Sequence, residues 1–344
     1  MRLLITGGAG FIGARLARSL LARDTLGGRR IERLVLADQF AIPADLAADP
    51  RVETRVGALL AQCATVATER YDGVFHLASA VSGECEADFE LGLRSNLDST
   101  RALLDALRAT VAAGATPARF VFSSSVAVFG PDPSAPLPAR VTDRTLPAPQ
   151  TSYGTHKLMC EYLIADYTRK GYVDGRAARL MTVTVRPGRP NGAASSFFSG
   201  IIREPLAGLE AICPVSPETS HPLTSPARTI DGLIAVYEAE RDAFGGRLAI
   251  NLPALSIRVA DMLDALETVA GRAVRDRVRF VEDPVIAGIV ANWPAGATAE
   301  RAARLGLTSD ADFTDVIRQY IADCVASPAG ATALQGLPTD RRSA

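Results

Sequence analysis

The sequence is poor in the residues that disulfide frameworks and metal centres require. Its 344 residues include five cysteines and three histidines. They stand apart in the chain, at Cys63, Cys85, Cys160, Cys213, Cys324, His76, His156 and His221. Because the cysteines are odd in number and form no C-x-x-C pair, we expect neither a disulfide framework nor a metal site. Scattered cysteines of this kind fit the reducing cytoplasm.

The chain also has almost no net charge and no long uninterrupted apolar segment. Lys and Arg number 37 against 38 Asp and Glu, a formal net charge of −1. This balance gives no electrostatic reason to expect nucleic acid or an anionic membrane as a partner. Glycines interrupt the apolar N-terminus, and no later run could span a bilayer. With 48% hydrophobic residues, disorder is excluded as the main state.

What the chain does have is a regular alternation of short apolar runs and amphipathic stretches. The apolar runs, which predict buried strands, lie at residues 2–6, 34–37, 52–56, 73–77, 119–122 and 182–185. The stretches with helical spacing between them lie at residues 14–23, 91–108 and 153–170. Strands separated by helices predict an α/β fold, a Rossmann-type doubly wound parallel sheet with helices on both faces.

After residue 186 the alternation stops, and proline and glycine become frequent. We predict an NAD-binding domain over residues 1–186, to which residues 229–253 return. Residues 187–228 and 254–326 would form a smaller C-terminal substrate lobe, and residues 327–344 a mobile tail.

The first chemical signal is a glycine-rich turn between the first strand and the first helix. Gly7, Gly10 and Gly13 have the spacing that allows a tight turn, close approach to a pyrophosphate and close packing of helix on strand. Phe11 and Ile12 begin the helix, whose positive end would face the phosphates. The pattern predicts dinucleotide binding, while small residues at an ordinary strand–helix turn are the alternative.

Asp38, at the end of the second strand, decides between the two nicotinamide dinucleotides. Its carboxylate can accept hydrogen bonds from the adenosine ribose, but it would repel the 2′-phosphate of NADP. The next residues, Gln39 and Phe40, supply no arginine to offset that repulsion. NAD is therefore the predicted cofactor, unless Asp38 is a solvated turn residue.

A serine, a tyrosine and a lysine form the second signal. Ser125 follows the fifth strand, and Tyr153 and Lys157 lie one helical turn apart. A free tyrosine is a poor base at neutral pH, but a nearby ammonium and the positive nicotinamide would lower its pKa. Tyr153 would then take a proton from a substrate hydroxyl while Ser125 holds the same oxygen. The alternative is a tyrosine and a lysine that simply share a helix surface.

These signals carry a family resemblance. The segments TGGAGFIG (6–13), FHLAS (75–79), FVFSSSVAVFG (120–130) and YGTHK (153–157) resemble the extended short-chain dehydrogenase/reductases, which include nucleotide-sugar epimerases and dehydratases. The resemblance covers roughly residues 1–190. It implies that Ser125, Tyr153 and Lys157 form the catalytic triad. It also implies a homodimer in which the helices at 91–108 and 153–170 pair across a two-fold axis.

The same resemblance implies further cofactor contacts. Ala78 and Ser79 would line the nicotinamide ribose, and Asn96 would support the active-site helix. The remaining expected contacts are Leu59, beside the adenine, with Ser123 and Pro187. The acidic residue that often binds adenine in this family is missing from the segment Gly57-Ala58-Leu59.

The second half resembles a narrower branch of the family, which oxidises C2 of a small four-carbon sugar acid with NAD. The segments that carry this resemblance are 186–192, 197–206, 211–217, 225–228, 292–294 and 301–306. A guanidinium suits a carboxylate, so we expect Arg189 and Asn191 to bind the substrate together with Ser125 and Tyr153. A nucleotide-sugar 4-epimerase that retains NAD, a uronate or other aldonate dehydrogenase, and a non-catalytic dinucleotide sensor remain open.

Overall fold

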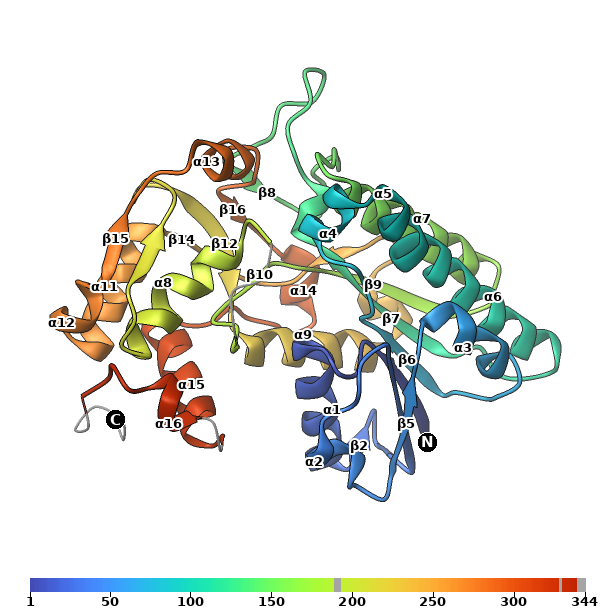
Figure 1. Cartoon of the computed structure of the whole chain (residues 1–344). Coiled ribbons are helices and arrows are strands. Elements are labelled where there is room, and N and C mark those ends of the chain that lie inside the picture. The colour runs from blue at the N-terminus through green and yellow to red at the C-terminus, as the bar shows by residue number, and fades with distance from the viewer. Residues whose placement is uncertain (189–192, 328–329, 339–344) are drawn as a thin grey trace.

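A seven-stranded parallel sheet forms the centre of the computed structural model, which describes residues 1–188, 193–327 and 330–338 (Figure 1). The strand order is β13-β9-β7-β6-β1-β4-β5, and every pairing is parallel. The strands are β1 (Arg2–Thr6), β4 (Arg33–Asp38), β5 (Val52–Val56), β6 (Gly73–His76), β7 (Arg119–Ser125), β9 (Asp174–Leu180) and β13 (Ile250–Asn251). The predicted Rossmann-type fold is confirmed.

Helices cover both faces of this sheet (Figure 1). One face carries α1 (Phe11–Arg23) and α9 (Pro226–Glu238), and the other carries α3 (Leu59–Val66), α6 (Ser99–Ala112) and α7 (Ser152–Arg169). Alternate strand residues enter the two cores: Leu3 and Ile5 pack on the side of α1, and Leu4 packs on the side of α6. This alternation explains why the strands are apolar throughout.

The strand order reverses between β1 and β6, which are neighbours in the centre of the sheet. The chain continues from β1 toward β4 and from β6 toward β7, so a crevice opens at the carboxyl ends of β1 and β6. Ligands of open α/β sheets bind at such a switch point. The glycine-rich turn after β1, Asp38 at the end of β4 and Ser125 at the end of β7 all lie on this edge.

The sixth strand of the sheet differs from the prediction. We predicted a central strand over residues 182–185, and this is wrong: the sixth central strand is β9, which contains two buried arginines. Arg176 donates to two carbonyl oxygens of α9, and Arg179 forms an ion pair with Glu161 of α7. Because these contacts satisfy both arginines, the strand can be buried despite its polar residues.

A second lobe holds a three-stranded sheet with the order β10-β12-β14 and a helical core beside it (Figure 1). Its main elements are β10 (Thr182–Val183), β12 (Ser220–Thr224), β14 (Leu255–Arg258), α8 (Ser196–Leu206), α11 (Val259–Ala270) and α15 (Phe313–Val325). Phe198, Leu263 and Ile317 are among the buried residues that join these helices in one core.

Shorter elements complete the described chain. They are β2 (Thr25–Leu26), β3 (Arg29–Arg30), α2 (Ala44–Ala47), α4 (Ser82–Ala87), α5 (Phe89–Gly92), the π-helix η1 (Leu93–Asp98), the 3-10 helix η2 (Val126–Val128), β8 (Arg140–Val141), α10 (Arg241–Phe244), β11 (Ala211–Cys213), α12 (Arg272–Arg275), β15 (Val278–Phe280), α13 (Pro284–Val290), β16 (Gly296–Ala297), α14 (Glu300–Arg304) and α16 (Gly330–Ala333).

Two parts of the second half pack differently from the prediction. Ala302 of α14 joins the core of the central sheet, so residues 254–326 do not all belong to the smaller lobe. The prediction of a mobile tail is wrong for residues 330–338, because Leu334 and Leu337 are buried in the core of that lobe. The glycine, alanine and proline around these two leucines hid their apolar spacing.

Within the described ranges, every helix is too short or too polar to cross a bilayer. The same residues contain no group of three or more His, Cys, Asp and Glu side chains that could hold a metal ion.

Candidate active site

The glycine-rich turn forms a cradle that leaves no room for side chains. Gly7 has a φ of 75°, and a Cβ there would lie 2.8 Å from the backbone nitrogen of Ala78. A Cβ at Gly13 would collide with the carbonyl oxygen of Gly7. Gly10 caps α1 and donates its N–H to the same oxygen at 3.1 Å. The N–H groups of the first turn of α1, which begins with Phe11 and Ile12, therefore face an open backbone surface that fits a pyrophosphate.

Asp38 ties the end of β4 to this cradle. Its Oδ2 accepts the N–H of Ala9 at 2.9 Å, and its Oδ1 accepts the N–H of Phe40 at 3.0 Å. The carboxylate is thus fixed beside the glycine turn, where an adenosine ribose would lie. Leu59 begins α3 close by, after the end of β5. These residues fit NAD.

Asn96 holds the loop that follows β6. Its side chain is buried, and its Oδ1 accepts the N–H of Ala80 at 2.7 Å and the hydroxyl of Ser79 at 3.1 Å. Asn96 lies in the π-helix η1, an element that is common at functional sites. Ala78 and Ser79 lie at the mouth of the crevice beside Gly7, so Asn96 positions the residues expected at the nicotinamide ribose.

His76 forms the buried floor of the crevice, a role that the sequence did not indicate. Its two ring nitrogens contact the hydroxyls of Thr6 at 2.6 Å and Thr100 at 2.8 Å. The Thr6 hydroxyl in turn accepts the N–H of Ala78. Burial, helped by the charge of Lys157, lowers the pKa of His76 to about 3, so the ring stays neutral and fixes the ends of β1 and β6. Its position as the polar last residue of the apolar strand β6 was the available signal.

The structure brings Ser125 and Tyr153 together. Gly154 makes this possible, because a Cβ there would collide with the carbonyl oxygen of Ala127 in η2. Thr151 caps α7 by accepting the N–H of Gly154 at 3.0 Å. The first turn of α7 therefore packs directly on the end of β7, which brings Tyr153 close enough to Ser125 for the serine hydroxyl to lower the pKa of the tyrosine.

Lys157 is buried beneath this pair. Its ammonium donates to the carbonyl of Ser123 at 2.8 Å and lies 4.7 Å from the ring centroid of Phe122 and 5.4 Å from that of Tyr153. Ser123 is fixed in turn, since its hydroxyl donates to the carbonyl of His76 at 3.2 Å. Burial lowers the pKa of Lys157 to about 8.

The pKa of Tyr153 departs from the sequence-based prediction. Burial raises this pKa to about 12, and the Ser125 hydroxyl and the charge of Arg186 lower it only in part. Burial therefore outweighs the positive charge nearby, which includes the Lys157 ammonium 5.4 Å from the Tyr153 ring centroid. The chain alone thus keeps Tyr153 protonated at neutral pH.

A buried ion pair behind the triad holds the strand ends together. Both carboxylate oxygens of Glu161 accept from the guanidinium of Arg179, at 2.9 and 2.7 Å, and the hydroxyl of Ser124 also donates to Glu161. The pair joins α7, β7 and β9 next to the catalytic side chains. Sequence reasoning missed it, although Glu161 follows Lys157 by one helical turn.

Arg186 is a further charged group at the site. Its Nε donates to the carbonyl of Val183 at 2.9 Å, and its Nη2 donates to the hydroxyl of Ser195 at 3.0 Å. The two residues predicted to bind substrate from this segment, Arg189 and Asn191, lie outside the described residues. Pro187, predicted near the cofactor, is exposed.

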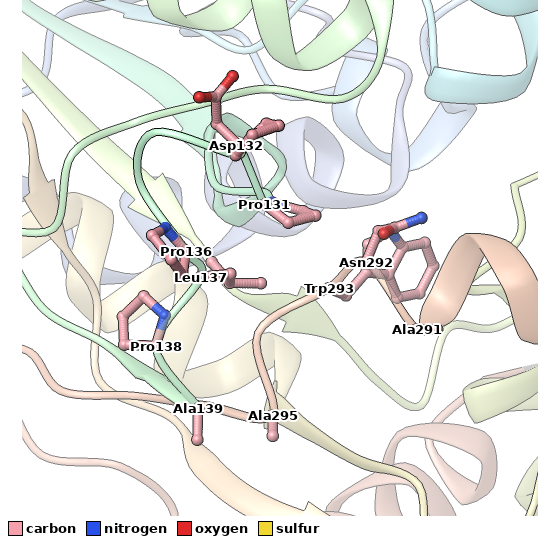
Figure 2. A pocket seen from close by; sticks show the side chains of 11 residues that line it. Pro131, Asp132, Pro136, Leu137, Pro138, Ala139, Ala291, Asn292, Trp293 and Ala295 are labelled. Carbon is pink, nitrogen blue, oxygen red and sulfur yellow. The ribbon is translucent and has the colours of Figure 1, made fainter.

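Two surface cavities are lined by residues other than the triad. One, of about 580 Å³, lies between the proline-rich loop after Gly130 and Trp293, which Figure 2 shows on opposite sides of the pocket. The ring of Trp293 also packs 5.2 Å from the ring of His221. The other, of about 610 Å³, lies between α5 and the start of α7, beside Phe89 and Met159.

Comparison with known proteins gives a consistent picture. The model of the NAD dependent epimerase/dehydratase family matches residues 3–219. D-erythronate dehydrogenase from Cupriavidus necator is 49% identical over 332 residues, which cover 94% of this chain and 98% of that protein. D-erythronate dehydrogenase from Haemophilus influenzae is 41% identical, covering 93% and 99%. The crystal structure of a nucleoside-diphosphate-sugar epimerase from Agrobacterium tumefaciens matches with a TM-score of 0.89 and 38% identity, covering 96% of each chain.

Proposed function

The chain belongs to the NAD dependent epimerase/dehydratase family and is an NAD-dependent oxidoreductase, and we propose that it oxidises D-erythronate. The reaction would convert the C2 hydroxyl to a carbonyl and give 2-dehydro-D-erythronate. The observation that carries this proposal is the similarity, over nearly the whole chain, to two D-erythronate dehydrogenases from different bacteria.

The arrangement of Ser125, Tyr153 and Lys157 supports the proposed chemistry. Bound NAD supplies the carbon that accepts the hydride from C2. Tyr153 takes the proton of the C2 hydroxyl, and Ser125 holds the same oxygen. Lys157 fixes the end of β7 through the carbonyl of Ser123 and adds positive charge beneath the tyrosine ring. Loss of the proton to Tyr153 and of the hydride to NAD would leave a carbonyl at C2.

Because burial raises the pKa of Tyr153, proton uptake needs nearby positive charge. Arg186 supplies one such charge from the chain, and the oxidised nicotinamide ring would supply another. We therefore assign the base role to Tyr153 in the cofactor-bound enzyme only.

The expected binding residues fall into two sets in this proposal. The cofactor set is Gly7, Gly10, Phe11, Ile12, Gly13, Asp38, Leu59, Ala78, Ser79, Asn96, Ser123, Tyr153, Lys157 and Pro187. Arg189 and Asn191 remain proposed substrate ligands together with Ser125 and Tyr153. NAD would occupy the domain built on the central sheet, and the acid would lie between that domain and the second lobe.

The test is a turnover assay with free NAD. We expect NADH to accumulate in proportion to D-erythronate consumed, and the product to react as a 2-oxo acid. The same protein is to be incubated with UDP-glucose and UDP-galactose. Interconversion of the UDP-sugars without net NADH, and no reaction with D-erythronate, would establish the nucleotide-sugar 4-epimerase instead. Faster oxidation of a uronate or of another aldonate would assign that acid as the substrate in place of D-erythronate.

Two tyrosine variants separate catalysis from binding. Tyr153→Phe is expected to lower turnover at least ~100-fold while NAD still binds, because only the proton-accepting oxygen is lost. Tyr162→Phe, on an exposed position of the same helix, is the matched control and should retain activity. Full activity in Tyr153→Phe would contradict the assigned base.

We also propose that the protein is a cytoplasmic homodimer. Phe89 of α5 and Met159 of α7 are exposed apolar side chains on neighbouring helices, with exposed fractions of 58% and 46%. An apolar face of this kind suits a second copy of the chain. Light scattering should give the dimer mass for the wild type and the monomer mass for Met159→Glu. A monomeric wild type would contradict the dimer, and cell fractionation tests the compartment.

A further inference from the structure

Arg186 follows the end of β9 by six residues, and Leu180 at that end lies beside Ser125 of the triad in the sheet. Its guanidinium has no acidic partner in the described part of the chain. Its two hydrogen bonds go to neutral acceptors, the carbonyl of Val183 and the hydroxyl of Ser195. By contrast, the buried guanidiniums of Arg176 and Arg179 each form an ion pair with a carboxylate. Arginine keeps its charge in proteins, and a half-buried charge without a counter-ion costs free energy. Such a charge is available to an anionic ligand.

The lobe fixes this guanidinium in one place. Ser195 immediately precedes α8 and receives one end of the guanidinium. The backbone of Arg186 is held as well: its N–H donates to the hydroxyl of Ser199 at 3.0 Å, and its carbonyl accepts from Arg203 at 2.8 Å. Arg203 itself is paired with Glu204. A preorganised guanidinium loses little entropy when it binds a ligand.

We propose that the guanidinium of Arg186 binds the carboxylate of the substrate, directly beside the carbon that is oxidised. The inference rests on the proposed function and deepens it, because it explains why the substrate is a 2-hydroxy acid. In such an acid the carboxylate is bonded to C2, so it must lie close to the group that takes the C2 hydroxyl proton. The register of β7 and β9, which sets Leu180 beside Ser125, brings the segment of Arg186 to this edge of the sheet. The charge of Arg186 also lowers the pKa of Tyr153, which supports this placement. A guanidinium also matches a carboxylate with two parallel hydrogen bonds.

The charge of Arg186 has a second consequence for Tyr153. In the free enzyme it favours the phenolate and so lowers the pKa of Tyr153. A bound carboxylate offsets that charge, so the effect is smaller in the substrate complex. The pH profile of kcat/KM reports the free enzyme and that of kcat reports the complex. Removal of the Arg186 charge should therefore move the alkaline rise of kcat/KM to higher pH more than that of kcat.

The experiment compares Arg186→Gln and Arg186→Lys with Arg277→Gln. Arg277 is the matched control: it is half-buried in the same lobe, and in the described part of the chain its guanidinium also donates to neutral acceptors, the carbonyls of Pro205 and Gly336. For Arg186→Gln we expect KM for D-erythronate to rise roughly 30- to 100-fold with NAD affinity unchanged, as for loss of a charge-assisted pair. Arg186→Lys keeps the charge but cannot form two parallel hydrogen bonds with a carboxylate. Its KM should therefore lie between those of the wild type and Arg186→Gln.

A binding measurement keeps this test independent of the proposed substrate. Oxalate is titrated calorimetrically into the NADH complex of the wild type and of each variant. We expect the wild type and Arg277→Gln to bind it and Arg186→Gln to bind at least ~30-fold more weakly. If the wild type binds oxalate through Arg186 but does not oxidise D-erythronate, the proposed function fails and the carboxylate site stands.

Three results would overturn the inference. The first is a KM for D-erythronate in Arg186→Gln that is within about 3-fold of the wild-type KM. Loss of a charged hydrogen bond should raise KM by more than that. The second is equal oxalate affinity in Arg186→Gln and the wild type. The third is a wild type that binds neither acid. If Arg186→Gln does not fold, the folded Arg186→Lys must still show the raised KM.

Discussion

Replacing Lys157 by methionine should stabilise the protein near neutral pH while it abolishes catalysis. The ammonium of Lys157 is buried, and burial lowers its pKa from 10.5 to about 8. Each unit of pKa corresponds to about 1.4 kcal/mol, so holding the charged form in the folded state costs about 3 kcal/mol. Methionine fills nearly the same space without a charge. Loss of the hydrogen bond to Ser123 costs about 1 kcal/mol, so the net stabilisation is about 1–2 kcal/mol.

The pH dependence of this effect has a definite sign. Below a pH of about 8, Lys157 is protonated in both states, and the full cost is present. Between about 8 and 10.5 the unfolded chain binds a proton that the folded protein does not, so the wild type becomes more stable as pH rises. The Lys157→Met variant lacks this group. The wild type should therefore gain about 3 kcal/mol relative to the variant across that window.

Urea unfolding of both proteins without NAD, in steps from about pH 7 to about pH 10, measures the difference directly. We expect the excess unfolding free energy of Lys157→Met to shrink as pH rises and then to change sign. A difference in unfolding free energy that stays constant across the window would refute the buried charge. A variant less stable than the wild type at neutral pH would show that the contacts of the ammonium outweigh its burial.

Three further substitutions test other parts of the site. Gly154→Ala should lower activity at least ~100-fold and cost about 1–3 kcal/mol in a urea titration, because its Cβ meets the carbonyl of Ala127; wild-type activity would contradict the contact. Glu161→Gln should destabilise the fold by about 3–5 kcal/mol, since Arg179 is left buried without a carboxylate, and a loss under about 1 kcal/mol would speak against this. Asp38→Asn should raise KM for NAD about 10-fold and reduce the preference over NADP, and an unchanged ratio of the two kcat/KM values would argue against its ribose contact.

The fold could be predicted from the sequence because most central strands are apolar and the turn after β1 accepts almost no residue but glycine. Gly7 and Gly13 have no space for a side chain, and the resulting spacing is visible without a structure. The prediction placed the sixth central strand at residues 182–185 and not at β9, because Arg176 makes the β9 segment polar by hydropathy. Its burial depends on acceptors in α9, far away in the sequence.

The site was predictable where local spacing carries the chemistry and not where charges balance across elements. Tyr153 and Lys157 share one helix, so their proximity follows from their separation. The direction of the shift in the pKa of Tyr153 does not follow from the sequence, because it depends on how deeply the folded chain buries the hydroxyl. Arg186 was likewise hidden. Its proximity to Tyr153 results from contacts with Val183 and Ser195, and the sequence favoured Arg189 in the same segment.

The most direct test of the central claim follows the hydrogen atom on C2. D-erythronate carrying deuterium at C2 is incubated with the enzyme and NAD, and the nicotinamide product is analysed by mass spectrometry. The account predicts that the deuterium moves to the nicotinamide ring while the acid becomes a 2-oxo acid, with slower turnover than for the unlabelled acid. Deuterium that stays on the acid, or unlabelled NADH, would show that C2 of D-erythronate is not the site of oxidation.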